Sequence, residues 1–232
     1  MNFYYGLVDE ANTAWGFLEE TDPRAWEDAE QTILKPTMIF LTAEEWQQVL
    51  SEQSQGRQIV GFGGKCFTAE RGRYYVDAEG WHKKSDEEFN REKAEETREQ
   101  LVQQIYQIKA DKAYNGVIIN NLLVFETNQT AITNTVASLA LMPEQGSASW
   151  KFYTVTGEPT VQPITKAQLG FIASFGQNMI NQCFGVEGAA NEQLRAATVA
   201  QLIDNEWVEA FVNGVQTAMD NINNRIEVQL GE

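Results

Sequence analysis

The chain has 232 residues, of which 43% are hydrophobic and 22% charged, a composition typical of a globular protein with one or two domains. Its formal net charge of −16 argues against nucleic acid as the main partner, because binding a phosphate backbone requires clustered Lys and Arg. No apolar run approaches the roughly 20 residues that span a bilayer, and no secretory signal opens the sequence, so we expect no membrane insertion. The two cysteines, Cys66 and Cys183, define no disulfide framework and favour synthesis in a reducing cytoplasm.

Residues 1–84 are predicted to form a small antiparallel β region. Its expected strands are short and separated by polar or glycine turns, at residues 3–8, 14–18, 58–60, 66–68 and 73–76. The acidic segment at residues 19–35 is predicted as loop with at most one helical turn. Thr42 and Glu45 have the spacing of a capping box, which starts a helix that stops near Gly56.

Residues 85–114 are predicted to form one long connecting helix. Ser85 and Glu88 form a second capping-box pattern at its start. The first half of the helix is almost wholly charged, and apolar residues such as Leu101 and Ile105 occur only in the second half. The polar half is therefore expected either to link the two parts of the chain or to bundle loosely with other copies.

Residues 115–232 are predicted to form a C-terminal module of helices and short β-hairpins. Asn120-Asn121 is expected to turn a hairpin, and a helix capped near Thr127 follows. Strands at residues 150–155 and 160–162 lead into a helix whose start carries the capping box Thr165–Gln168. The fold class predicted for the whole chain is α+β.

The last helix is predicted at residues 204–230, and its apolar residues recur with a spacing of three or four. They are Trp207, Phe211, Val215, Ala218, Ile222 and Ile226. This spacing is typical of a helical seam. Packing of the seam against its own chain is the favoured interpretation, and a homotrimer seam is the alternative.

The C-terminal half resembles an uncharacterised domain found at the C-terminal end of many bacteriophage tail and tail-fibre-assembly proteins. Residues 115–132 resemble the first half of that domain. The further matching features are Trp150-Lys151, the threonine cap at Thr165, Phe184 and the segment Glu192–Ala197.

The N-terminal half is similar to tail-fibre assembly proteins as well. It begins with the tyrosine-rich strand Phe3-Tyr4-Tyr5. Further on, an acidic helix capped by Thr42 is followed by the turn Gln53-Ser54-Gln55-Gly56 and the apolar strand around Ile59-Val60.

The resemblance implies a non-enzymatic, chaperone-like protein of the host cytoplasm that binds a phage tail fibre and assists its folding and trimerisation. Such a protein then leaves the fibre or remains in the virion tail. Two other functions stay open: a structural virion component such as an adaptor, hinge or fibre segment, and an enzyme that cleaves polysaccharide with a pair of carboxylates.

The N-terminal half contains six aromatic residues, more than a small sheet is expected to bury. They are therefore candidate partner-binding residues. They are Trp15, Phe17, Trp26, Tyr74, Tyr75 and Trp81.

No motif predicts a catalytic, cofactor-binding or metal site. The segment Gly61–Cys66 resembles a phosphate loop only partly, because Ile59 stands where its first glycine belongs and Cys66 where Ser or Thr must bind the metal. A glycine turn explains this segment better. His82 is the only histidine and lies in a polar stretch, so neither a multi-histidine metal site nor a Ser-His-Asp triad is expected.

Overall fold

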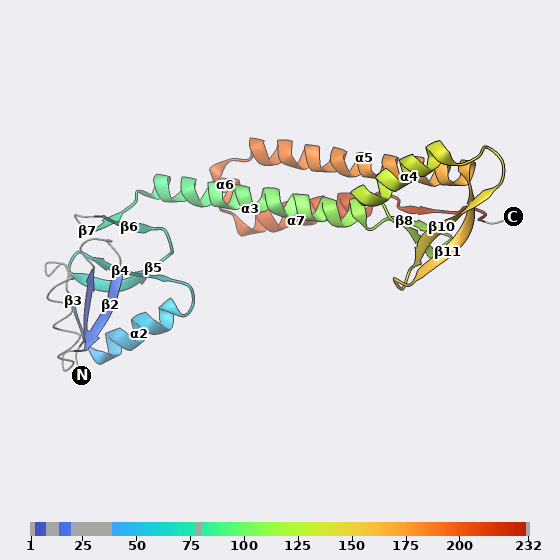
Figure 1. The fold of residues 1–232 in the computed structure, drawn as a ribbon. Helices are drawn as coiled ribbons and strands as arrows, with labels where there is room; N and C mark the ends of the chain where they lie inside the picture. Colours follow the sequence, from blue (N-terminus) through green and yellow to red (C-terminus); the bar gives the residue numbers. More distant parts are fainter. Residues whose placement is uncertain (1–2, 8–13, 20–38, 78–79, 231–232) are drawn as a thin grey trace. The chain divides into compact units, whose positions relative to one another are not determined.

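The computed structural model describes residues 3–7, 14–19, 39–77 and 80–230 (Figure 1). Helices and small antiparallel sheets both occur, which confirms the α+β fold class. The chain divides into two compact units, residues 1–92 and 93–232. Apart from Glu19, the predicted loop at residues 19–35 lies outside the described residues.

Within the described residues, the first unit is built from short antiparallel strands and one helix between them. Strands β1 (Phe3–Leu7), β2 (Ala14–Glu19) and β3 (Ile39–Leu41) form a sheet in the order β2-β1-β3. Helix α2 (Ala43–Gln53) follows. The remaining strands form two hairpins, β4 (Gln58–Phe62) with β5 (Lys65–Ala69) and β6 (Tyr74–Asp77) with β7 (Gly80–Lys83).

Side-chain hydrogen bonds fix helix α2 at its start and its end. The predicted capping box between Thr42 and Glu45 is confirmed, with both of its hydrogen bonds present. At the far end, the Thr68 hydroxyl of β5 donates to the Glu52 carboxylate, and Arg57 Nε donates to Thr68 Oγ1 at 3.0 Å. The hydrogen bond from Thr68 lowers the pKa of Glu52, with a smaller effect from Gln48.

The glycine-rich segment at residues 61–64 is a turn between β4 and β5. Gly63 and Gly64 have φ values of +61° and +74°, which side chains disfavour. The β4–β5 register places Gly61 opposite Cys66. The interpretation of this segment as a hairpin turn is therefore confirmed.

Helix α3 (Asp86–Tyr114) has the bounds that the sequence predicts, and its residues are divided between the two units. Its start packs on the first unit, where Phe89 is buried and the guanidinium of Arg73 lies 4.9 Å from the centre of the Phe89 ring. The Ser85 hydroxyl accepts a hydrogen bond from the Glu88 N–H at 3.1 Å. The residues from Lys93 onward belong to the second unit.

In the second unit, α3 lies beside α5 (Lys166–Ala196) and α7 (Asn205–Asp220), and the short α6 (Val199–Leu202) connects the last two (Figure 1). The three long helices share one hydrophobic cluster. Its buried members are Ala94, Leu101, Ile105, Ala190, Leu194, Leu202, Phe211 and Val215. The capping box Thr165–Gln168 starts α5 as predicted.

A five-stranded sheet covers the other end of this helical unit. It contains β8 (Val117–Ile119), β9 (Leu123–Phe125), β10 (Ser147–Thr154), β11 (Pro159–Thr165) and β12 (Arg225–Ile226), in the order β11-β10-β9-β8-β12. All neighbours pair antiparallel except β12, which runs parallel to β8. Asn120 and Asn121 turn the β8–β9 hairpin with φ values of +52° and +57°, as predicted.

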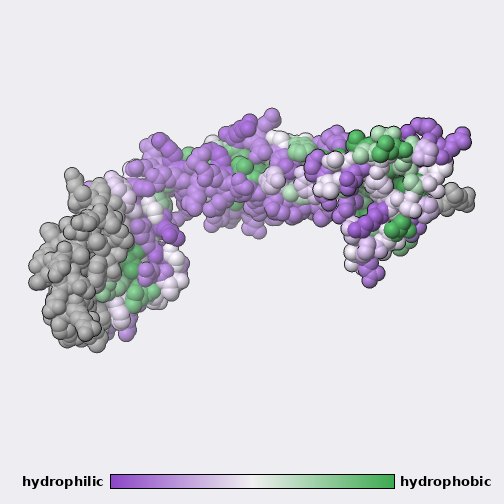
Figure 2. All heavy atoms as spheres, viewed as in Figure 1, coloured by the Kyte–Doolittle hydropathy of each residue, from purple (hydrophilic) through white to green (hydrophobic). Residues whose placement is uncertain are grey.

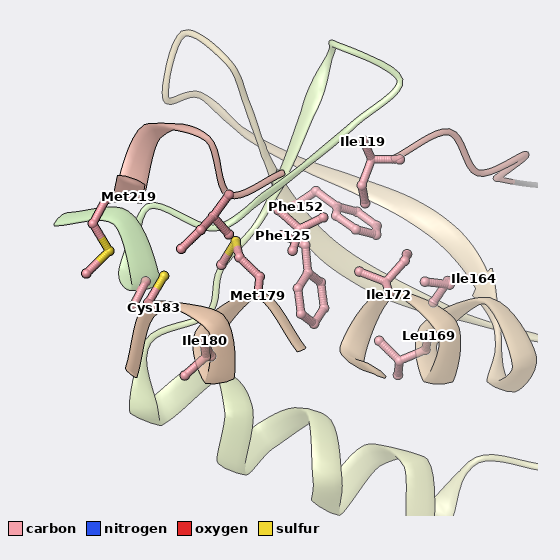
Figure 3. Packing of buried hydrophobic residues seen from close by; sticks show 13 residues of the cluster. Ile119, Phe125, Phe152, Ile164, Leu169, Ile172, Met179, Ile180, Cys183 and Met219 are labelled. Carbon is pink, nitrogen blue, oxygen red and sulfur yellow. The ribbon is translucent and has the colours of Figure 1, made fainter. Parts of the chain in front are cut away.

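The first half of α5 packs against this sheet through the main hydrophobic cluster (Figure 3). Phe125 and Phe152 from the strands meet Leu169, Ile172 and Met179 from the helix. All five side chains are buried. Burial of this apolar area, worth about 25 cal/mol per Å² removed from water, stabilises the contact between sheet and helix.

The predicted last helix is too long, and half of its seam is buried within the chain. Helix α7 ends at Asp220, and after the intervening turn β12 pairs with β8. Phe211 and Val215 are buried against α3 and α5 of the same chain, and Ile222 is buried in the main cluster. Trp207, Ala218 and Ile226 are partly buried. The buried half of the seam thus packs against its own chain, as the favoured interpretation expects, and the homotrimer seam stays a prediction.

Lys109 of α3 is a buried charge, with 4% of its surface exposed. Its Nζ lies 3.0 Å from the Glu187 carboxylate of α5. The same ammonium lies 4.3 Å from the ring centre of Tyr106 and 4.7 Å from that of Phe184. A buried ammonium needs such partners, so this contact favours one register of α3 against α5.

Replacing Lys109 by Met should leave Glu187 without its counter-charge and lower the free energy of unfolding by about 3–5 kcal/mol. The double variant Lys109→Met/Glu187→Leu should recover most of that loss, because well-packed apolar side chains can replace a buried ion pair. Urea denaturation followed by circular dichroism measures both values. A loss below about 1 kcal/mol for the single variant would show that the pair behaves as a solvent-exposed one.

Candidate functional site

Two helical segments that pack on each other in the second unit lack charged residues. Helix α4 (Gln129–Leu141) contains no Asp, Glu, Lys, Arg or His, and neither do residues 167–186 of α5. In the whole chain 22% of residues are charged. We call the face formed by α4 and residues 167–186 the charge-free surface. Depletion of charge is what distinguishes the core of a protein–protein interface from the rest of a surface.

A groove of about 310 Å³ runs between the two helices. Its apolar lining includes Ile132, Val136 and Leu139 from α4, and Gly170, Ala173 and Ile180 from α5. Together with Gln177, which also lines the groove, these α5 residues are spaced by three, four and three positions along one side of the helix. The groove has free space at Gly170, because a Cβ added there would meet only Leu139 Cδ2 at 3.8 Å.

Some large apolar side chains stay exposed on these two helices, and Val136 among them lines the groove. The exposed fractions are 64% for Val136, 86% for Leu141 and 54% for Phe171. Figure 2 shows hydrophobic residues gathered over α4 and the first half of α5, in contrast to the hydrophilic surface over α3. Exposed apolar residues gathered in this way are typical of an interaction surface.

The described residues that line the groove bring no carboxylate, histidine, lysine or cysteine into it. Its hydroxyl groups are partly used within the chain, since Thr127 Oγ1 donates to the Ala113 carbonyl at 2.6 Å and Thr135 Oγ1 to the Ala131 carbonyl at 2.7 Å. Asn128 therefore caps α4, in agreement with the cap predicted near Thr127. The groove is suited to bind apolar side chains through dispersion and burial.

The structure does not bring the six candidate aromatic residues together on one surface. The side chains of Trp15 and Trp26 lie outside the described residues, and Phe17 is partly buried against Leu41. The prediction that Trp81 is exposed is wrong, because only 9% of this residue is exposed and its side chain packs with Val60 and Ala69.

Tyr74 and Tyr75 face opposite sides of strand β6. Tyr74 is half-buried and packs against the cluster that contains Trp81. Tyr75 is exposed and stacks on His82 of β7, with ring centres 5.2 Å apart. Of the six candidates, Tyr75 is thus the one whose described side chain stays exposed.

Sequence reasoning missed the charge-free surface, although a signal for it was present. Residues 129–141 and 167–186 are charge gaps in an otherwise charged chain. Each gap alone is also compatible with a buried helix. The two uncharged segments form one surface only because they pack on one another and leave some apolar side chains exposed.

Among the residues that the structure covers, no three or more His, Cys, Asp or Glu side chains gather as a metal site would require. The two thiols lie in environments that suppress their ionisation. Burial, and then the nearby Glu45 carboxylate, raises the pKa of Cys66 to about 12. Burial also raises the pKa of Cys183.

Searches against protein-family models, curated proteins and solved structures find no match for this chain. None of its described helices is long and apolar enough to cross a membrane.

If the groove is open in solution, Gly170→Ala should raise the free energy of unfolding by about 0.5–1 kcal/mol, because Ala favours the helix interior. The matched control is Gly176→Ala, whose Cβ would lie 3.1 Å from Thr127 Cγ2 and 3.4 Å from Val117 Cγ2. Thermal unfolding compares the two variants. Equal destabilisation of both would contradict an open groove at Gly170.

Both thiols should react slowly with iodoacetamide in the native protein, because the thiolate is the reacting form. Cys66, with its pKa raised to about 12, should stay slow from pH 7 to about pH 9, where an ordinary thiol ionises. Mass spectrometry of the alkylated protein measures the rates, and the urea-unfolded chain is the control. Fast native labelling of Cys66 would contradict the burial described above.

Proposed function

We propose that this protein is a tail-fibre-associated assembly factor of a bacteriophage, which binds the fibre through the charge-free surface. The observation that carries the proposal is the groove between α4 and α5 with its exposed apolar rim. The resemblance of both halves of the sequence to tail-fibre-assembly proteins supports the identity of the partner. Binding in this proposal needs no reactive group.

The physical mechanism is temporary cover of apolar fibre surface. A fibre subunit that has not yet joined its trimer exposes the residues that the trimer later buries. Docking of the charge-free surface removes such residues from water, at about 25 cal/mol per Å² of apolar area. The net charge of −16 keeps the complex soluble meanwhile.

Release follows from competition for the same residues. When fibre subunits close on one another, they bury the apolar area that this protein covered, and the assembly factor dissociates. The same surface would hold the protein on the virion if some fibre residues stayed uncovered. Mass spectrometry of purified virions distinguishes a factor that leaves from one that remains.

The proposal is tested by co-expressing the chain with the tail-fibre gene next to its own gene. We expect the fibre to become soluble and trimeric only in the presence of the chain, and to co-purify with it before trimer closure. Val136→Asp should weaken this binding by at least about tenfold, because it places an unpaired charge in the interface.

Val102→Asp is the matched control, since Val102 is also an exposed helical valine but lies on α3, outside the charge-free surface. This variant should bind the fibre like the wild type. A fibre that folds equally well without the chain would refute the proposed function. If the Val136→Asp variant binds the fibre as well as the wild type does, the binding site lies elsewhere on the chain.

A further inference from the structure

We infer that strand β10 binds an extended peptide segment of another protein along the edge that β9 leaves uncovered. Within the described residues, β9 pairs with β10 only at Tyr153 and Thr154, near the end of β10. On its other side, β10 pairs with β11 at seven successive positions. The first part of β10 is therefore paired on one side alone. Binding here is independent of the proposed function, whose groove lies on another face of α4.

A backbone hydrogen bond shows which groups of β10 point toward the uncovered edge. The Val155 N–H donates to the Leu122 carbonyl at 3.1 Å, on the β9 side. Successive residues of an antiparallel strand direct their backbone groups to alternate sides, so every second residue before Val155 points the same way. Beyond the end of β9, these residues are Lys151, Ser149 and Ser147. Among the described residues no strand pairs with their N–H and C=O groups, which we call the open edge of β10.

The outer edge of the same sheet, in contrast, is protected against pairing. The β11 residues that lie opposite Tyr153 and Ser149 direct their backbone groups outward, and they are Pro159 and Pro163. Proline has no N–H to donate, so a further strand finds few partners on that side. The open edge of β10 contains no proline. The sheet is therefore suited to accept an added strand at the open edge and not at its outer edge.

A hollow of about 350 Å³ lies beside the open edge, a volume within the range of ligand pockets. Its lining comes from the end of β9, from β10 and from one side of α4, and includes Phe125, Glu126, Trp150, Ala131, Asn134 and Ser138. Two of the three α4 residues, Ala131 and Ser138, are small. The hollow thus lies beyond the end of β9, where a strand paired with the open edge would run.

The backbone pattern identifies the occupant as an extended peptide. Donors and acceptors that alternate at strand spacing are matched by the backbone of another strand, and a segment of about five residues spans the open edge. The residue opposite Trp150 would share the face on which Phe125 stacks on the Trp150 ring, with ring centres 6.1 Å apart. This position favours an aliphatic or aromatic side chain. Its two neighbours point to the other face, where Glu126 and Lys151 are exposed, and favour polar side chains.

Peptide selection with the purified full chain tests this assignment. Heptapeptides from a random library are depleted on the Ser149→Pro variant and then selected on the wild type. We expect enriched peptides with an apolar residue between two polar ones. Ser149→Pro removes an open-edge N–H without removing a bond to β11, and fluorescence polarisation should show binding weakened by at least about tenfold.

Methylation of the peptide nitrogens, one at a time, separates strand addition from other modes of binding. Because only alternate residues of an added strand donate to β10, methylation should weaken binding by at least about tenfold at every second residue and little between them. Ala131→Trp fills the hollow and should also block the peptides. Ala137→Trp, at an exposed position of α4 outside the hollow, is its matched control.

Val161→Pro is the matched control for Ser149→Pro, because Val161 lies opposite Lys151 and its N–H points to the outer edge. This variant should bind the peptides like the wild type. So should Val136→Asp, which alters the groove of the proposed function and leaves the open edge unchanged. The peptide site and the fibre-binding groove can therefore hold or fail separately.

Circular dichroism verifies that each variant is folded, and Ala131→Trp takes the place of Ser149→Pro if the proline variant is not. A selection that enriches no peptide would overturn the assignment. So would binding without a two-residue period in the methylation series, or equal loss of binding in Ser149→Pro and Val161→Pro.

Discussion

Helix α5 holds the second unit together, because its buried residues belong to both hydrophobic clusters. Leu169 and Ile172 near its start pack against the five-stranded sheet, whereas Ala190 and Leu194 near its end pack against α3 and α7. Glu187 lies between these two groups in the helix and binds the buried Lys109. A shift of α5 by one residue would disrupt both clusters and separate this ion pair, so the sheet and the helices are constrained together.

The same helix also explains why an apolar surface remains. Between residues 167 and 186 it has apolar side chains toward the sheet and toward α4, and no charged side chain that would solvate a free face. Helix α4 is 13 residues long, whereas α5 has 31, so α4 covers only part of that length. The acidic residues lie instead on elements such as α3. This segregation lets one chain combine high net charge with a surface suited to apolar contacts.

The sequence by itself determined the features that depend on neighbouring residues. The capping boxes at Thr42 and Thr165, the bounds of α3 and the Asn120-Asn121 turn all follow from hydrogen bonds or φ preferences within a few residues. Only the tertiary structure decided which apolar residues are covered. Trp81 is predicted to be exposed, yet Val60 and Ala69, distant in the sequence, bury it. The groove at Gly170 likewise exists because two uncharged helices meet. Whether a side chain is buried depends on the residues across the contact, which a local sequence pattern does not specify.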